Sequence, residues 1–181
     1  MIPPRKYVLT AGPSAGKSST IRELAARGHR IAPEGARVVL DQLVSEGINP
    51  KWFRENYSQS YQDMVIESDF RIAENTPDDV PVFMDRSAAD SIAYTRLTDR
   101  AVPDQLMERC QNEYGIVFLL DQINFSDDYA RTEDEKMAKE IHEELHNVYK
   151  DLGHTVVSVP VMPVDERADY IENRIEQVAI H

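Results

Sequence analysis

Five short apolar runs, separated by stretches of helical periodicity, constrain the fold of this chain most. The runs lie at residues 7–9, 29–32, 80–84, 116–120 and 155–159. The fourth run is continuously apolar, as expected of a strand that is buried on both faces of a sheet. Strands that alternate with helices pair in parallel through right-handed crossovers. The pattern therefore predicts an α/β fold, with one domain over residues 1–181 and helices on both faces of a parallel sheet.

Between the apolar runs, apolar residues recur every three or four positions, which predicts helices. These helices are expected at residues 17–27, 36–46, 57–75, 87–98, 103–111, 137–152 and 164–178. Gly28, Gly47 and Gly153 directly follow three of them, as glycines at helix ends do. The polar segment 122–136 lacks such a pattern and is expected to form a lid.

The turn after the first apolar run carries the most specific motif. Residues 11–18 read Ala-Gly-Pro-Ser-Ala-Gly-Lys-Ser, a phosphate-binding loop in which Ala11 replaces the first glycine. In such a loop, successive N–H groups and the N-terminus of the next helix face an anion. Lys17 would bridge the β- and γ-phosphates of ATP or GTP, and Ser18 would bind Mg²⁺. The expected nucleotide-binding residues are Gly12, Pro13, Ser14, Ala15, Gly16, Lys17, Ser18 and Ser19.

The same turn also fits the G-x-S-x-G pattern of a hydrolase nucleophile elbow, with Ser14 as the nucleophile. This pattern leaves Lys17 and Ser18 unexplained. It also places the elbow after the first strand, without the upstream sheet that hydrolases of this type carry. The phosphate-binding reading explains more of the residues.

A third motif, His142-Glu143-Glu144-Leu145-His146, matches H-E-x-x-H. On a helix, His142 and His146 share one side and could bind Zn²⁺, with Glu143 as a base. Leu152 stands where the extended motif has its third histidine, which leaves Glu166 or Glu172 as candidate ligands. A zinc hydrolase is therefore a remote alternative.

Side chains that directly follow the other strands should lie beside the loop, since ligands bind at the carboxyl ends of parallel strands. Glu34 could take a proton from a substrate hydroxyl, or it could be an acid that stabilises the start of a helix. Asp85 would bind Mg²⁺ together with Ser18, or it could belong to a helix cap. Arg86 would hold substrate or phosphate through its bidentate fork.

Arg131 is the only cation between Asp121 and Lys136. It would reach the transferring phosphate when the lid closes, or it belongs to a solvated run of charges. Asp121 is either a third acid near the metal or only the end of a strand. Arg37 is either a substrate contact or part of a surface salt bridge.

The charge of the chain restricts its partners. With 20 Lys and Arg against 32 Asp and Glu, the net charge is −12, which argues against a nucleic-acid binder. A small anionic ligand is still compatible with a locally positive site. The single cysteine, Cys110, excludes an internal disulfide. The sequence has no apolar signal core and no stretch of about 18 apolar residues, so a cytoplasmic protein without a membrane segment is expected.

With the loop, Glu34, the 85–87 triplet and Arg131 in this order, the chain resembles a known family. It resembles the small AAA-type ATP/GTP-binding family that includes the NadR-like nicotinamide-riboside kinase domain. Segments 9–18, 33–37 and 83–86 carry the resemblance, with weaker support from 119–121 and 152–160. The chain is more distantly similar to deoxyribonucleoside kinases, which have a Glu-Arg-Ser triplet where this chain has Asp85-Arg86-Ser87.

The resemblance implies a P-loop sandwich with the sheet order 2-3-1-4-5 and transfer of the ATP γ-phosphate to a nucleoside-like or other small hydroxyl acceptor. A regulatory ATP/GTPase without such an acceptor is the alternative. Aromatic residues of segment 49–75 discriminate between the two, because in a kinase some of them should line a pocket that faces Glu34. These aromatic residues are Trp52, Phe53, Tyr57, Tyr61 and Phe70. The acceptor, the base of the nucleotide and the oligomeric state are left open.

Overall fold

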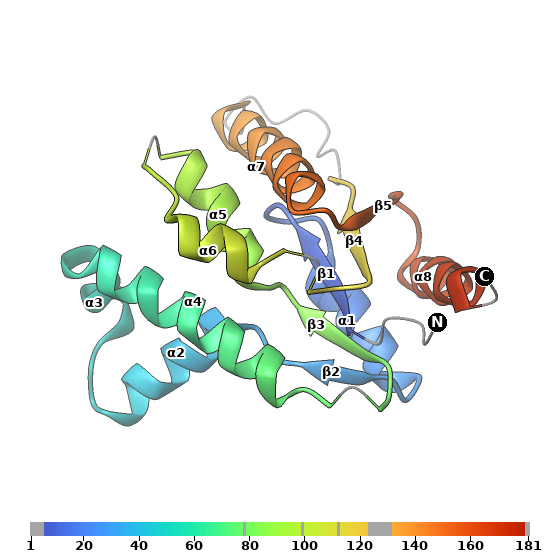
Figure 1. Ribbon diagram of the computed structural model, residues 1–181, viewed down its shortest axis with the longest axis horizontal. Coiled ribbons are helices and arrows are strands. Elements are labelled where there is room, and N and C mark those ends of the chain that lie inside the picture. Colours follow the sequence, from blue (N-terminus) through green and yellow to red (C-terminus); the bar gives the residue numbers. More distant parts are fainter. Residues whose placement is uncertain (1–5, 78, 99, 112, 123–131, 180–181) are drawn as a thin grey trace.

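The strands form one parallel sheet with the order that the resemblance implied. The computed structural model describes residues 6–77, 79–98, 100–111, 113–122 and 132–179 (Figure 1). Its strands are β1 (Lys6–Ala11), β2 (Arg30–Ala32), β3 (Val82–Asp85), β4 (Ile116–Leu120) and β5 (Thr155–Val159). They are arranged as β2-β3-β1-β4-β5, and every neighbouring pair is parallel. Because β1 is central, the turn that follows it lies in the middle of the sheet edge.

Helices cover both faces of this sheet, which makes a three-layer sandwich (Figure 1). The helices are α1 (Lys17–Ala26), α2 (Gly35–Ser45), α3 (Pro50–Asn56), α4 (Ser58–Asn75), α5 (Ala88–Arg96), α6 (Asp104–Arg109), α7 (Thr132–Asp151) and α8 (Val164–Ala179). One core cluster joins the sheet to α1 and α8, and the other joins it to α4, α5, α6 and α7. Successive strand residues alternate between the two clusters, as the pleat requires: Val8 belongs to one cluster and Leu9 to the other.

Two helices, α3 and α7, differ from the expected ones. Helix α3 is separate from α4, since Asn49 caps it by accepting a hydrogen bond from the N–H of Trp52 and Pro50 opens its first turn. Helix α7 begins at Thr132, so residues 132–136 of the expected lid are helical. The sequence there is acidic, which suits the N-terminus of a helix. The remaining lid residues 123–131, including Arg131, lie outside the described residues.

Strand β3 also begins later than expected, at Val82 rather than at residue 80. Pro81 has no N–H to donate to a neighbouring strand, so it delays the pairing. Cys110 is buried, as expected. Among the described residues, no helix is long and apolar enough to span a membrane.

Helix α7 allows a direct test of its amphipathic packing. Leu145 is completely buried against the sheet, whereas the adjacent His146 is only half-buried. We expect Leu145→Ala to lower the free energy of unfolding by about 2–5 kcal/mol, because it removes core contacts and leaves a cavity. His146→Ala, the matched control, should cost less than about 1 kcal/mol. Urea unfolding measures both, and equal losses would contradict the packing described here.

Candidate functional site

The loop between β1 and α1 turns through two residues with a left-handed backbone conformation. Gly16 has φ 81° and Ser14 has φ 60°, both in the left-handed region. The carbonyl of Gly16 accepts hydrogen bonds from the N–H groups of Ser19 and Thr20, both at 3.1 Å, and so starts α1. Pro13, Ser14 and Ser18 are exposed. The start of α1 therefore lies at the solvent-exposed surface of the molecule.

Gly12 allows the loop to lie close to α7. A Cβ on Gly12 would collide with the side-chain amide of Gln122 and would lie 3.1 Å from the carbonyl oxygen of Ala138. The loop is thus packed between the end of β4 and α7, and a larger residue at position 12 would push it away.

Lys17, the first residue of α1, forms an ion pair with Asp85, the last residue of β3. The register places Asp85 beside Leu9 of β1, two residues before the loop begins. Asp85 therefore touches the lysine of the loop, and both side chains are mostly buried. The helix that follows β3 is capped by Ser87 and not by Asp85, because the Ser87 hydroxyl accepts from the N–H of Ala89.

Arg86 connects the ends of two strands. Its Nε lies 2.9 Å from the Glu34 carboxylate, and its Nη1 donates to Asp90 and to the hydroxyl of Tyr94, both at 3.3 Å. Its φ of 69° is unusual for a residue with a side chain and costs about 1–3 kcal/mol, so surrounding contacts must hold it. Its N–H donates to the Leu9 carbonyl at 3.0 Å. Burial acts to lower the pKa of Arg86, but Asp90, Tyr94 and Glu34 raise it overall, so the side chain stays a cation.

Asp90 holds this arrangement in place from α5. Its carboxylate accepts hydrogen bonds from the hydroxyl of Thr10, the N–H of Ser87 and the hydroxyl of Tyr149. The Ser87 and Tyr149 hydroxyls are themselves 2.8 Å apart. The buried network fixes the Arg86 turn against the core.

Glu34 is the residue before α2, yet its side chain makes no capping hydrogen bond. It reaches Arg86 instead and lines a cavity of about 300 Å³ between α2, α4 and α5. The other residues of this cavity include Arg54, Tyr61, Asp69, Arg86, Asp90 and Tyr94. Glu34 and Arg86 thus meet at the wall of a ligand-sized cavity.

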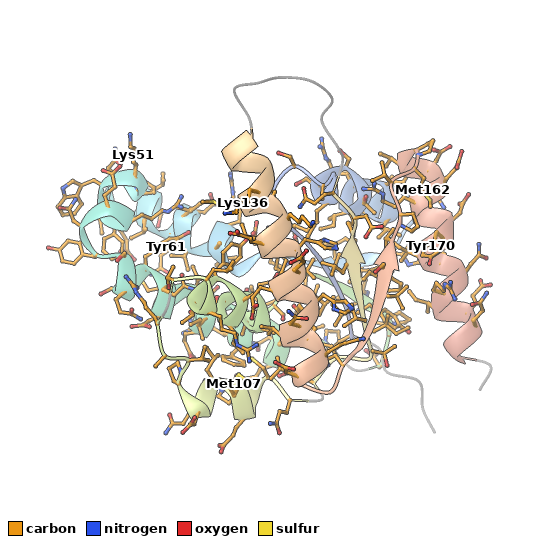
Figure 2. The ribbon with its side chains drawn as sticks, turned by 90° about the horizontal axis from the view of Figure 1, so that it is seen from above. Lys51, Tyr61, Met107, Lys136, Met162 and Tyr170 are labelled. Carbon is orange, nitrogen blue, oxygen red and sulfur yellow. The ribbon has the colours of Figure 1, made fainter. Side chains whose placement is uncertain are left out.

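Of the aromatic residues of segment 49–75, Tyr61 lines this cavity. Tyr61 lies on α4, as labelled in Figure 2, with the guanidinium of Arg54 over its ring at 5.3 Å. Trp52 and Tyr57 are exposed, and Phe70 belongs to the core. One of the five residues therefore occupies the place that the kinase hypothesis requires.

Asp69 also lines the cavity, although it is not among the site residues that the sequence predicts. It is 7% exposed, and one oxygen accepts the N–H of Gly35 at 3.0 Å. A Cβ on Gly35 would lie 2.7 Å from the carboxyl carbon of Asp69, so α2 begins directly against α4. The signal was a polar residue in a buried stripe with Val65 and Ala73.

Burial raises the pKa of Asp69 from 3.8 to about 7, and the charges of Asp90 and Glu34 act in the same direction. The Gly35 N–H and Arg86 oppose the shift. In the folded protein this carboxyl therefore titrates near neutral pH, while it faces the cavity.

The other candidates are not brought to this cluster. Arg37 forms an exposed pair with Asp41 on α2 at 3.2 Å. Asp121 lies at the end of β4, 3.8 Å from the ring of His142. Glu143 is paired with Lys139 on the outside of α7.

Neither alternative motif gains support from the described part of the chain. No group of three His, Cys, Asp or Glu residues there could hold a metal ion, so His142 and His146 have no third zinc ligand. None of the hydrogen bonds of the described residues joins a histidine to Ser14, as a nucleophile elbow would need.

The raised pKa of Asp69 predicts a pH dependence of stability. Between about pH 4 and 7 the native state keeps the proton of Asp69 while the unfolded state has lost it, so the free energy of unfolding falls as the pH rises. The total loss is on the order of 1–4 kcal/mol. Asp69→Asn should lack this loss in urea unfolding at pH 5 and pH 8.

Asp63→Asn is the matched control, because Asp63 is an exposed acid on the same helix. It should keep the pH dependence of the unchanged protein. Identical profiles for Asp69→Asn and the unchanged protein would show that Asp69 does not titrate in this range.

Known structures share the whole fold at low sequence identity. NadR in complex with NR superposes with a TM-score of 0.66 at 17% identity, covering 97% of this chain and 51% of that chain. Thymidylate kinase from Candida albicans gives 0.63 at 13% identity, covering 97% and 92%. Shikimate kinase from Acinetobacter baumannii gives 0.54 at 13% identity, covering 97% and 94%. The chain thus spans about half the length of the NadR chain, and similarity at this identity shows the fold.

A search of curated proteins gave no match. The sequence does match a protein family described as an AAA domain, over residues 6–167. This match includes the loop, Glu34 after β2, Asp85 at the end of β3, and the start of α8. The chain belongs to this AAA-domain family and has a P-loop that binds nucleoside triphosphates.

Proposed function

We propose that the protein is a Mg²⁺-dependent phosphotransferase that moves the γ-phosphate of ATP or GTP to a hydroxyl group of a small acceptor. One observation carries the proposal: the cavity beside Glu34 and the phosphate-binding loop lie at the same edge of the sheet. Two consecutive residues connect them, because Asp85 contacts Lys17 of the loop and Arg86 contacts Glu34. A cavity of about 300 Å³ is at the lower end of the size of small-molecule sites.

The donor side of the site consists of the loop and Lys17. The loop N–H groups and the Lys17 ammonium would neutralise the phosphates. Phosphate oxygens would compete with Asp85 for Lys17, which would release the carboxylate. The Asp85 carboxylate and Ser18 hydroxyl are the hard oxygen ligands that Mg²⁺ takes. Bound there, Mg²⁺ would supply charge neutralisation at the β- and γ-phosphate oxygens.

The acceptor side consists of Glu34, Arg86 and the cavity. The acceptor hydroxyl would give its proton to the Glu34 carboxylate while its oxygen bonds to the γ-phosphorus. The bond from that phosphorus to the β–γ bridging oxygen breaks, and a nucleoside diphosphate leaves. Arg86 fixes the orientation of Glu34 through the 2.9 Å contact. Tyr61 and Tyr94 offer aromatic surfaces to the acceptor.

The related structures support this assignment only in general terms. Two of them are kinases by name, and NadR was solved with NR. Their names imply different acceptors, so the fold does not select one. An acceptor of nucleoside type is the one that the chain's resemblance and the aromatic cavity walls favour.

A regulatory NTPase without a small acceptor is the second candidate. It uses the same loop, and the observation in its favour is the exposed aromatic pair Trp52 and Tyr57, with ring centroids 5.6 Å apart outside the cavity. Such a pair suits a contact with a partner better than a buried substrate. Stimulation by an acceptor distinguishes the two candidates.

The test measures nucleoside diphosphate release from ATP and from GTP with Mg²⁺, alone and with a panel of nucleosides that includes nicotinamide riboside. Lys17→Ala is the blank. We expect one acceptor to raise turnover well above its background. Nucleotide binding without stimulation by any acceptor would favour the regulatory candidate.

Glu34→Gln tests the proposed base. Transfer should fall by about 10²–10⁴-fold, since the amide cannot take the proton, while the Kd for nucleotide stays within about twofold. Glu46→Gln is the matched control, at the exposed far end of α2, and should leave both quantities unchanged. Loss of transfer and nucleotide binding together, or of neither, would contradict the role of Glu34.

A further inference from the structure

Arg167, in the first turn of α8, is a buried cation that forms no ion pair with any of the described residues. It is 2% exposed, among the largest completely buried side chains. Its Nη1 donates to the carbonyl oxygen of Ala15 at 2.8 Å, inside the phosphate-binding loop. Its Nε is buried and has no hydrogen-bond partner among the described residues. None of their carboxylates is within ion-pair distance of it.

This situation is costly for a folded protein. A guanidinium has five N–H donors, and a buried one is normally paired with acids. Arg27, which follows α1, shows the usual solution, because it contacts the carboxylates of Glu23 on α1 and of Asp169 and Glu172 on α8. Burial lowers the pKa of Arg167, while the charge of Asp121 acts in the opposite direction. The position of Arg167 therefore needs another explanation than stability of the fold.

The location of its contact supplies that explanation. Ala15 belongs to the loop, and the next two residues are Gly16, with its left-handed φ, and Lys17. The guanidinium holds the carbonyl of this peptide, so it restrains the loop that presents N–H groups to an anion. Its positive charge also adds to the potential at that anion site, and in a buried environment such charges are weakly screened.

We propose that Arg167 is a positioning residue of the nucleotide site, which holds the loop at Ala15 and supplies a buried positive charge that the polyphosphate of a nucleoside di- or triphosphate compensates. The proposal rests on nucleotide binding by the loop and not on transfer to an acceptor. A purely structural residue would stabilise the protein equally with and without nucleotide. Arg167 should instead contribute to the affinity for nucleotide.

The decisive variant is Arg167→Met, which keeps an unbranched apolar chain of similar length. A buried charge without an ionic partner is costly for the folded state, so an apolar side chain in its place should not destabilise the fold. We expect the Tm without nucleotide to stay the same or to rise. The Kd for ADP with Mg²⁺, measured by calorimetry, should rise about 10–100-fold, and the increase in Tm produced by saturating ADP should shrink.

Arg174→Met is the matched control, because Arg174 is an exposed arginine of the same helix, with contacts to Tyr170 and Gln177. It removes the same net charge and should change the Kd by less than about twofold. Arg167→Lys keeps the charge, and its Kd for ADP should stay within about threefold of that of the unchanged protein.

Four outcomes would overturn the proposal. The first is a fall in the Tm of nucleotide-free Arg167→Met with no change in Kd, and the second is failure of this variant to fold. Either would show that Arg167 serves the fold itself. The third is an equal loss of affinity in Arg174→Met, which would show a general charge effect. The fourth is a loss of more than tenfold in Arg167→Lys, which would contradict the role of the charge. Since no acceptor is used, these results are independent of whether the protein transfers phosphate.

Discussion

The Arg86 guanidinium is the contact on which the rest of the site depends. It lies where the ends of β2 and β3 meet the start of α5, and it binds the carboxylates of Glu34 and Asp90. The backbone of Arg86 has a left-handed φ, and its N–H donates a hydrogen bond to the carbonyl of Leu9 in the central strand. Because the buried hydrogen bonds of Asp90 hold this turn, the orientation of Glu34 toward the cavity follows from the packing of the core.

Two ion pairs with different roles lie side by side at this edge of the sheet. The Lys17–Asp85 pair joins the loop to β3, and the Arg86–Glu34 pair joins β3 to the residue after β2. Consecutive residues, Asp85 and Arg86, thus contact the loop and the wall of the cavity. A chain with a net charge of −12 gathers the cations Lys17, Arg86 and Arg167 around one edge, which suits an anionic ligand on an otherwise acidic surface.

Much of the fold could be predicted because it rests on local signals. The apolar runs, the glycines after helices and the loop motif each act within a few residues, and the sheet order came from the resemblance and is confirmed. Local signals do not identify Asp69 and Arg167 as site residues, because the contacts of both are with residues distant in sequence. Asp69 accepts a hydrogen bond from Gly35, and Arg167 donates one to Ala15. Helix α3 was missed because its capping residue Asn49 falls in a stretch without apolar periodicity. Periodicity predicts which face is buried, but it does not predict the partner of a buried charge.

The close approach of Gly35 to Asp69 affects how such a site can change during evolution. Asp69 of α4 lines the cavity and directly contacts Gly35, the first residue of α2, where a Cβ would have no room. A substitution that reshapes this part of the cavity for a different ligand would also displace Glu34. Arg54 and Tyr61 line the same cavity, and they contact each other through the guanidinium and the aromatic ring. New ligand preferences are therefore more accessible through side chains such as Arg54 and Tyr61 than through the contact between Gly35 and Asp69.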